Sequence, residues 1–185
     1  MPGKIRIIGG QWRGRKLQVI DKKGLRPTPN RIRETLFNWL IAQIPNSHCL
    51  DLFAGSGALG IEAASRGAKK VLLIEQDHEI YQQLQNYIKQ LTTDRIIAQQ
   101  ANALQLLKQS PATPFDIIFL DPPFGQNLLS TCCQLLETGQ WLNQSAYIYL
   151  ESERPQTELI LPQHWQIIRQ THAGQVTSSL VKREI

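Results

Sequence analysis

Apolar runs and helical patterns alternate along most of this 185-residue chain. The apolar runs lie at residues 48–53, 71–74, 95–98, 115–120 and 146–150, and the helical patterns between them lie at 57–66, 77–91, 103–108 and 128–136. Apolar strands that alternate with helices form a parallel sheet covered on both faces. Two last strands, at 165–171 and 176–182, flank a short turn and should be antiparallel to each other. The pattern therefore predicts an α/β fold with a mixed, mostly parallel sheet and an antiparallel C-terminal strand.

The N-terminal region follows a different pattern. Two runs of β-forming residues flank Gly9-Gly10, a strong turn signal, so residues 5–20 are predicted to form a β-hairpin. Thr28 suits the N-cap of a helix, and Pro29 suits its first position. Apolar residues then recur at helical spacing, which predicts one helix with a buried face.

Basic residues are concentrated in this N-terminal region. Residues 1–33 contain ten lysines and arginines and one acid, Asp21, whereas the rest of the chain has ten basic and fourteen acidic residues. A basic segment on a mildly acidic body suggests a polyanionic partner, although a solvated basic surface would have the same composition. We therefore divide the chain into a basic extension of hairpin and helix at residues 1–44 and an α/β domain at residues 45–185.

The remaining composition excludes several classes of protein. No apolar run approaches the roughly 18 residues that a membrane span requires, and residues 1–4 lack the apolar core of a secretion signal. Cys49, Cys132 and Cys133 form no metal-binding or redox pair and suit reduced, buried thiols. The four histidines share no metal spacing. We expect a cytoplasmic protein with no metal and no membrane partner.

A glycine-rich turn follows the first predicted strand of the α/β domain. Gly55, Gly57 and Gly60 have the GxGxxG spacing that lets a backbone approach a ligand closely. Glu75 ends the next strand, where an acid can bind a ribose diol. This pattern fits a nicotinamide or flavin cofactor as well as S-adenosylmethionine. Asp51, just before the turn, would repel a pyrophosphate and attract a sulfonium and an ammonium group, so its charge favours S-adenosylmethionine.

A second motif, Asp121-Pro122-Pro123-Phe124, follows the fourth apolar strand. Its prolines fix two φ angles and remove two N–H donors, which leaves the Asp121 carboxylate and the Pro122 carbonyl as acceptors. These acceptors can bind both hydrogens of a base amino group and localise its lone pair for attack on a methyl group. Phe124 can stack on the base, an interaction worth about 1–3 kcal/mol. A DPP sequence alone is usually a strand-ending turn, but its position after the glycine turn indicates a catalytic role.

Asn102 follows the third predicted strand of the α/β domain. Its side chain can hydrogen-bond the adenine ring of the cofactor, or it can cap the helix that follows. The two roles are compatible, and the sequence leaves both open.

Together these motifs resemble the signature of class I methyltransferases that act on amino groups of nucleic-acid bases. That signature is shared by enzymes acting on adenine N6, cytosine N4 and guanine N2, so it does not choose the base. The whole chain also resembles the RsmD family of bacterial 16S rRNA guanine-N2 methyltransferases. The resembling segments are RIIGGQWRGRKL at 6–17, LRPT at 25–28, Arg31, RETLFN at 33–38, IYLESE at 148–153 and AGQV at 173–176.

The resemblance implies a Rossmann-like fold and transfer of a methyl group from S-adenosylmethionine to N2 of a guanine in 16S rRNA, the one customarily numbered 966. The products would be N2-methylguanosine and S-adenosylhomocysteine, and the substrate would be the assembled small (30S) ribosomal subunit, methylated by a monomer. One alternative is an amino-methyltransferase of adenine N6 or cytosine N4 in RNA or DNA. Others are a nucleotide-binding oxidoreductase, disfavoured by Asp51 and the DPPF motif, and a non-catalytic RNA-binding factor, disfavoured by an intact Asp121 motif.

The resemblance also assigns roles to individual positions. The cofactor-binding positions it implies are Asp51, Phe53, Gly55, Gly57, Glu75, Gln76, Asn102 and Ala103. The positions that bind and activate the base are Asp121, Pro122, Pro123 and Phe124. The positions that contact rRNA are Arg6, Trp12, Arg13, Arg15, Lys16, Arg26 and Arg31. The next loop, Gly125-Gln126-Asn127, has no basic residue, whereas family members can be basic there.

Overall fold

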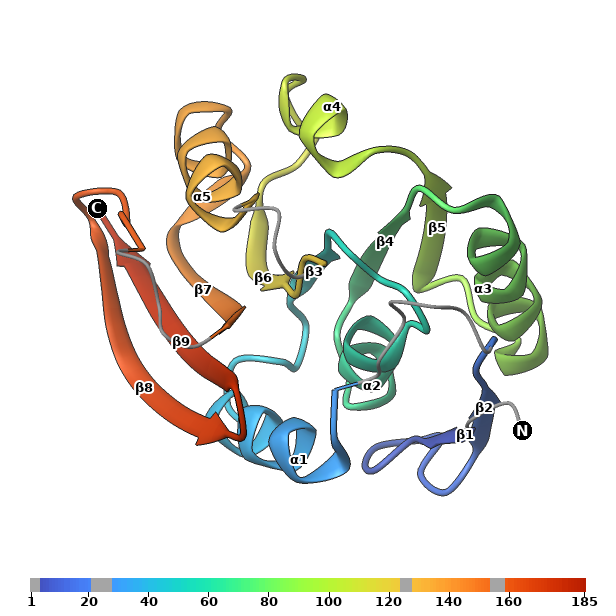
Figure 1. Ribbon diagram of the computed structural model, residues 1–185. Helices are drawn as coiled ribbons and strands as arrows, with labels where there is room; N and C mark the ends of the chain where they lie inside the picture. Colours follow the sequence, from blue (N-terminus) through green and yellow to red (C-terminus); the bar gives the residue numbers. More distant parts are fainter. Residues whose placement is uncertain (1–3, 21–27, 124–127, 154–158) are drawn as a thin grey trace.

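The computed structural model describes residues 4–20, 28–123, 128–153 and 159–185. Seven strands form one sheet in the order β5-β4-β3-β6-β7-β9-β8. The strands are β3 (His48–Asp51), β4 (Lys70–Glu75), β5 (Ile96–Gln100), β6 (Phe115–Leu120), β7 (Leu142–Glu153), β8 (Trp165–Ala173) and β9 (Val176–Glu184). The sheet lies at the centre of the molecule (Figure 1).

The pairing directions confirm the predicted mixed sheet. β3 pairs in parallel with β4 and with β6, β4 pairs in parallel with β5, and β6 does so with β7. Only β9 runs against its neighbours, since it is antiparallel to both β7 and β8. The chain leaves β3 toward β5 and then returns to the other side of β3 as β6, so the strand order reverses between β3 and β6. Ligands of open α/β sheets bind beyond the carboxyl ends of the strands at such a point.

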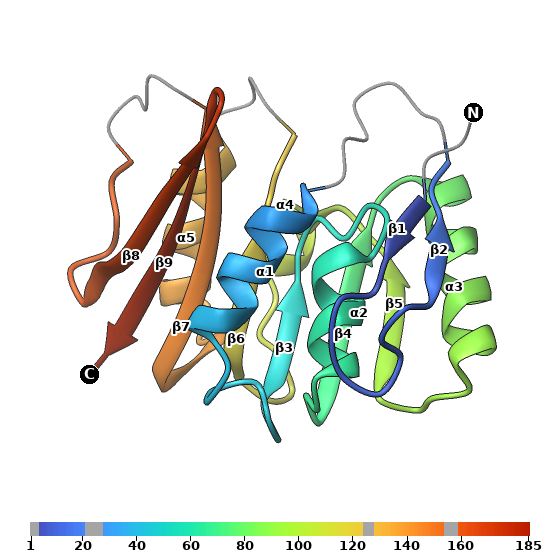
Figure 2. The same ribbon diagram turned by 90° about the horizontal axis from the view of Figure 1, so that it is seen from below.

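Helices cover both faces of the sheet, as the alternating pattern predicts. On one face lie α1 (Asn30–Trp39), α2 (Ala58–Ser65) and α3 (His78–Leu91), together with the N-terminal hairpin (Figure 2). On the other face lie α4 (Ala103–Leu107) and α5 (Leu128–Thr138). Asp77 caps α3, because its Oδ1 accepts hydrogen bonds from the backbone N–H groups of Glu79 and Ile80. Among the described residues, no helix is both long and apolar enough to span a bilayer.

The N-terminal hairpin pairs β1 (Lys4–Arg6) with β2 (Lys16–Gln18), as expected. The turn is longer than the predicted Gly9-Gly10 turn. Residues 7–15 connect the two strands and lie over α2, and the carbonyl of Gly10 accepts a hydrogen bond from the N–H of Arg13 within this connection. A β-carbon on Gly10 would stand 1.8 Å from the carbonyl oxygen of Ser65. The glycines therefore permit close contact with a helix, a requirement that has the same sequence signature as a tight turn.

This contact explains why all eight residues of α2 are buried, including two polar ones. The Glu62 carboxylate accepts hydrogen bonds from the backbone N–H groups of Ile8 (2.8 Å) and Gly9 (2.7 Å). The Ser65 hydroxyl donates to the carbonyl of Gly9 and accepts from the N–H of Trp12. The hairpin thus supplies the partners that buried polar groups require.

Arg33 of α1 joins the same cluster. Its side chain is 1% exposed and lies 3.8 Å from Glu62, and it donates to the backbone carbonyl of Arg6 and to Asn30. Arg66 pairs with Glu62 at 2.7 Å and stacks over the ring of Phe37. Hairpin, α1 and α2 are therefore linked through one buried carboxylate, and the apolar residues of the hairpin belong to the same core as the sheet.

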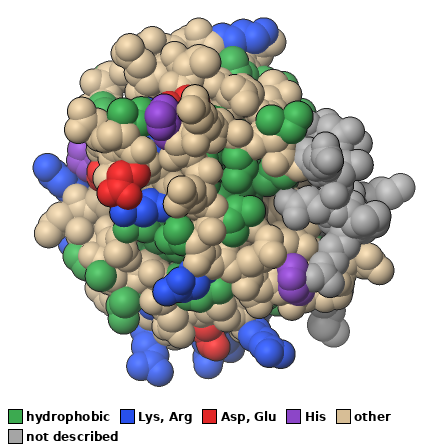
Figure 3. Space-filling model, turned by 90° about the vertical axis from the view of Figure 1, so that its left-hand side faces the viewer, with side chains coloured by type: hydrophobic (Ala, Val, Ile, Leu, Met, Phe, Trp, Pro, Cys, Tyr) green, Lys and Arg blue, Asp and Glu red, His purple; other side chains and the backbone are tan. Residues whose placement is uncertain are grey.

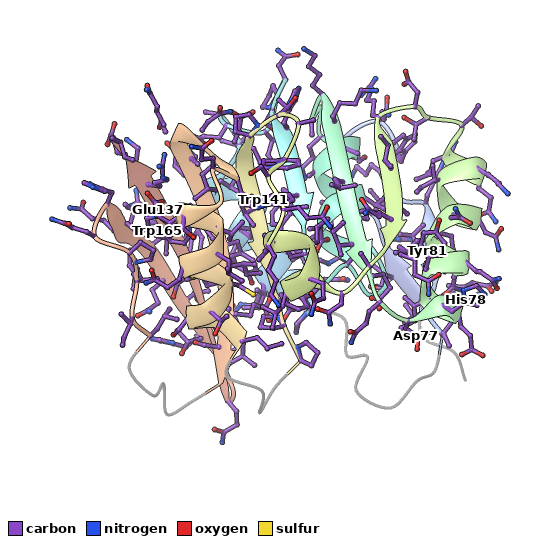
Figure 4. All side chains as sticks on the ribbon, turned by 90° about the horizontal axis from the view of Figure 1, so that it is seen from above. Asp77, His78, Tyr81, Glu137, Trp141 and Trp165 are labelled. Atoms are coloured by element: carbon purple, nitrogen blue, oxygen red, sulfur yellow. The ribbon has the colours of Figure 1, made fainter. Side chains whose placement is uncertain are left out.

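Polar side chains also join β8 and β9, at one edge of the sheet, to α5. Glu137 of α5 accepts hydrogen bonds from the indole N–H of Trp165 on β8 (2.8 Å) and from Arg183 on β9 (2.7 Å). Glu137 and Trp165 lie side by side in Figure 4. Arg183 holds the pKa of Glu137 below its usual value. The two C-terminal strands are thereby attached to the helix that follows β6.

We expect Gly10→Ala to destabilise the protein more than Gly14→Ala. Both glycines have positive φ (+74° and +87°), but an added β-carbon at Gly14 meets nothing within 4 Å. Backbone strain should cost each variant about 1 kcal/mol, and the clash with α2 should add about 1–3 kcal/mol at Gly10 alone. Urea unfolding measures both values. Equal destabilisation would show that the hairpin is not tightly docked on α2.

Candidate active site

A cavity of ≈ 1220 Å³ opens at the carboxyl ends of the central strands. The glycine turn after β3, the end of β4, the start of α4 and the residues after β6 line it. The start of α1 and the β8–β9 turn close it from the other side. The cavity therefore contains every described residue that the sequence assigns to the cofactor or to the base, except Gly57, which lies in the wall behind it.

The glycine turn packs closely against the sheet and α3. Gly57 has φ +76° at the N-terminus of α2, and a β-carbon there would lie 2.7–2.8 Å from Ile61 and Leu84. At Gly60 a β-carbon would lie 2.2 Å from Leu73. The last two glycines of the motif thus permit helix packing, and the turn before them faces the cavity with Phe53 and Gly55.

Glu75 and Asn102 lie next to the glycine turn. The Glu75 carboxylate accepts hydrogen bonds from the N–H of Gly55 (3.0 Å) and of Asp77 (2.7 Å). Asn102 caps α4 by accepting from the N–H of Gln105, which confirms one of its two expected roles. Its amide also donates to the side-chain oxygen of Gln76 at 3.0 Å. Together with Ala103, these polar groups form one wall of the cavity.

Asp51 is buried at the end of β3. Its Oδ2 accepts a hydrogen bond from the N–H of Gly60 at 3.0 Å, and its exposed fraction is 2%. Burial is the main cause that raises its pKa to about 7, and the charge of Glu75 adds to the shift. A carboxyl in this position favours a cation in the cavity, because a cation would offset the cost of its burial.

Asp121 follows β6 and lies in the same cavity as Asp51, between Thr28 and Glu151. Pro122 is buried behind it and Pro123 is exposed, while Phe124 lies outside the described residues. Thr28 was expected to cap α1, but Pro29 occupies the cap position without a side-chain hydrogen bond. The Thr28 hydroxyl instead donates to Oδ2 of Asp121 at 3.3 Å. The start of α1 thus belongs to the site.

Glu151 is a site residue that the motifs did not reveal. It ends the apolar core of β7, is 5% exposed and lines the cavity. Burial and the neighbouring Glu151 carboxyl raise the pKa of Asp121 well above its usual value, and burial also raises the pKa of Glu151. The available signal in the sequence was an acid at the end of an apolar run. The resembling segment at residues 148–153 includes Glu151 but assigned it no role.

The residues assigned to rRNA contacts divide into two groups. Arg6, Arg13, Lys16 and Arg31 are exposed, as is Arg15, whose guanidinium donates to the carbonyl of Gln90. Trp12 is only 6% exposed and packs in the core, so its ring is not presented to RNA and this assignment was wrong. Its size and apolar surface serve to dock the hairpin. Arg26 lies outside the described residues.

The sequence has close relatives among known proteins. Residues 5–182 match the family described as "Conserved hypothetical protein 95". The Escherichia coli (strain K12) protein named "Ribosomal RNA small subunit methyltransferase D" is 50% identical over 182 residues, which are 98% of this chain and 91% of that protein. The chain belongs to the RsmD family. Another member, of the same name and from Haemophilus influenzae, is 46% identical over 181 residues, 96% of this chain and 93% of that one.

A solved structure agrees with the RsmD assignment. "Putative methyltransferase yhhF from Escherichia coli" superposes with a TM-score of 0.92 at 46% sequence identity, and the match covers 99% of both chains. The RsmD fold therefore includes the N-terminal hairpin and both C-terminal strands. Among the described residues, no group of His, Cys, Asp or Glu side chains could hold a metal ion.

In this RsmD-family site, Asp51 should make stability depend on pH. Its raised pKa of about 7 means that the folded protein holds the proton more tightly than the unfolded chain. Its contribution to stability is therefore present at low pH and is lost as the pH rises through about 7. We expect Asp51→Asn to gain roughly 2–3 kcal/mol relative to wild type between about pH 5 and about pH 8.

Urea unfolding of both proteins across this pH range measures the difference. Asp94→Asn is the matched control, because Asp94 is an exposed aspartate outside the cavity. A wild-type-to-variant difference that stays constant with pH would contradict a buried, proton-binding Asp51.

Proposed function

We propose that this protein transfers a methyl group from S-adenosylmethionine to the exocyclic N2 of a guanine in 16S rRNA of the small ribosomal subunit. The position of Asp121 carries the proposal, because this half-buried residue lines the same cavity as the glycine turn. The relatives named as methyltransferases of the small-subunit rRNA support the class of substrate. The target would be the guanine customarily numbered 966, modified in the cytoplasm by a monomer.

The chemistry of the cavity fits S-adenosylmethionine. Asp51 offers a buried carboxyl to a cation, and Glu75 and Asn102 offer polar groups to a ribose and an adenine. Gly55 has no side chain, so a ligand can approach the backbone of the turn closely. S-adenosylmethionine would supply an electrophilic methyl group, whose bond to sulfur breaks with its electron pair staying on sulfur as the new bond to nitrogen forms.

Asp121 and the prolines after it would prepare the base for this transfer. The rigid Asp121-Pro122-Pro123 segment presents acceptors at one edge of the cavity, where they can bind the hydrogens of the amino group. Such bonds localise the nitrogen lone pair, and the nitrogen loses one of its two protons during the reaction. The Asp121 carboxyl is placed to accept that proton, since its raised pKa makes it a stronger base than an exposed aspartate.

The N-terminal hairpin would hold the rRNA. Its exposed cations are Arg6, Arg13, Arg15 and Lys16. They belong to the hairpin, which lies on the same face of the sheet as α1 (Figure 2). Contacts to phosphates position a protein without reading sequence. On the side of the molecule that carries β8, basic side chains are interspersed with acidic and uncharged ones (Figure 3).

The reaction itself is tested by transfer of labelled methyl from S-adenosylmethionine to small ribosomal subunits that lack base methylation, followed by digestion to nucleosides. We expect a single labelled product, N2-methylguanosine. Methyladenine or methylcytosine would keep the mechanism and replace the substrate. Tight cofactor binding with no transfer to subunits, free RNA or DNA would overturn the proposal.

Replacing Asp121 should separate binding from chemistry. We expect Asp121→Ala to lower turnover on the order of 100- to 1000-fold, because the amino group loses its main acceptor. Affinity for S-adenosylhomocysteine, measured by calorimetry, should stay within a few-fold of wild type. Asp94→Ala, at an exposed aspartate outside the cavity, is the control and should transfer methyl normally. Near-normal turnover by Asp121→Ala would exclude the mechanism.

The hairpin cations should account for part of the salt dependence of substrate binding. We expect the triple variant Arg13→Gln, Arg15→Gln, Lys16→Gln to reduce the slope of log affinity against log salt by up to about 2–3. Lys108→Gln, at the C-cap of α4 on the other face of the sheet, is the control and should leave the slope unchanged. Filter binding to small subunits over a salt series gives both slopes. An unchanged slope in the triple variant would mean that RNA binds elsewhere.

A further inference from the structure

Asp121 and Glu151 lie side by side at the carboxyl edge of the sheet. Each follows one member of the pair Leu120 and Leu150, which are in register on the parallel strands β6 and β7. Adjacent strands lie about 4.8 Å apart, so residues at matching positions are neighbours on the same face. Both carboxyls line the cavity; Glu151 is buried and Asp121 is half-buried.

Hydroxyl groups hold this carboxyl pair in place. The Tyr149 hydroxyl donates to Oε1 of Glu151 at 2.5 Å, and Tyr149 is fully buried. The Thr28 hydroxyl donates to Asp121 and also contacts Glu151. A hydroxyl carries one hydrogen and can donate to only one carboxylate, so the pair still needs further N–H or O–H donors if both carboxyls are ionised. Two buried like charges are costly without such donors.

The amino edges of the bases differ in the donors that they offer. Guanine has two adjacent donor groups, the N2 amino group and the ring N1–H. Adenine and cytosine have an amino group beside an unprotonated ring nitrogen, which is an acceptor. Enzymes that act on a base read such an edge by hydrogen bonds after the base leaves its stack. Two adjacent carboxylates can accept hydrogen bonds from both donor groups of guanine. With adenine or cytosine, one of the carboxylates would face the lone pair of the ring nitrogen and be repelled by it.

We infer that Glu151 is the specificity-determining residue of the site: while Asp121 binds the amino group, Glu151 accepts a hydrogen bond from the ring N1–H and so selects guanine. This inference rests on the proposed function, and it identifies the residue that chooses among bases which the DPPF motif treats alike. Tyr149 is its positioning residue. By binding one oxygen of Glu151, it leaves the other oxygen as an acceptor toward the cavity.

The inference is tested with small subunits reconstituted with guanine or with 2-aminopurine at the methylated position. 2-Aminopurine keeps the reactive amino group but has a lone pair at N1. We expect the wild type to methylate guanine about 100-fold faster or more, since a site built for an N–H rejects an analogue that lacks it. In Glu151→Gln, the amide oxygen keeps the Tyr149 bond and the NH₂ group faces N1. The guanine rate should then fall about 100-fold while the 2-aminopurine rate is maintained or rises.

Tyr149→Phe provides a second variant that retains the carboxylate. Without the orienting hydroxyl, we expect the guanine rate to fall about tenfold and the 2-aminopurine rate to change little. Tyr147→Phe, two residues earlier on β7 and outside the cavity lining, is the matched control and should leave both rates unchanged. Affinity for S-adenosylhomocysteine and the unfolding midpoint verify that each variant is folded.

The outcomes separate the two proposals. No methylation of guanine by the wild type would overturn the proposed function. Wild-type methylation of guanine combined with equal losses on both bases in the Glu151 and Tyr149 variants would overturn this inference alone, because a structural role lowers both rates together. If Glu151→Gln does not fold, the base-selective loss in Tyr149→Phe decides the question.

Discussion

The buried carboxylate of Glu62 is the contact on which the arrangement of the site depends. It binds two backbone N–H groups of the hairpin, faces Arg33 of α1 and pairs with Arg66 at the end of α2. Removing one partner from such a cluster leaves an uncompensated buried charge, which costs about 3–5 kcal/mol. Through Arg33, the same carboxylate positions α1, and Thr28, which lies just before the cap of this helix, contacts Asp121.

In the candidate active site, the acids that would bind the ligands also lower the stability of the ligand-free protein. Asp51 ends β3, Asp121 follows β6 and Glu151 lies near the end of β7, so the fold brings three acids to one edge of the sheet. Burial raises the pKa of each, which lowers the stability of the ligand-free protein at neutral pH. A cationic cofactor and a donor-rich base would supply the missing partners. The same three acids that lower the stability of the ligand-free protein are therefore the groups that would bind the ligands.

The basic N-terminal segment has two structural roles that its composition does not distinguish. Its exposed cations form a surface suited to phosphates, whereas Arg33 and Trp12 are buried and attach the segment to the sheet. Charge counts treat Arg33 and Arg31 alike, although helical periodicity puts one inward and the other outward. The hairpin shares one core with α2 and the sheet, so the surface that we propose for RNA has a fixed orientation toward the cavity.

The sequence by itself determined the α/β class, the strand–helix alternation, the cap at Asn102, and the positions of the glycine turn and Asp121. These follow from local periodicity and from motifs whose residues are adjacent in the chain. Only the tertiary structure decided that Gly10 and Trp12 dock on α2, that Thr28 binds Asp121 rather than capping α1, and that Glu151 lies beside it. The physical reason is that these contacts join residues from 30 (Asp121 and Glu151) to 93 (Thr28 and Asp121) positions apart, whose partners no local pattern can specify.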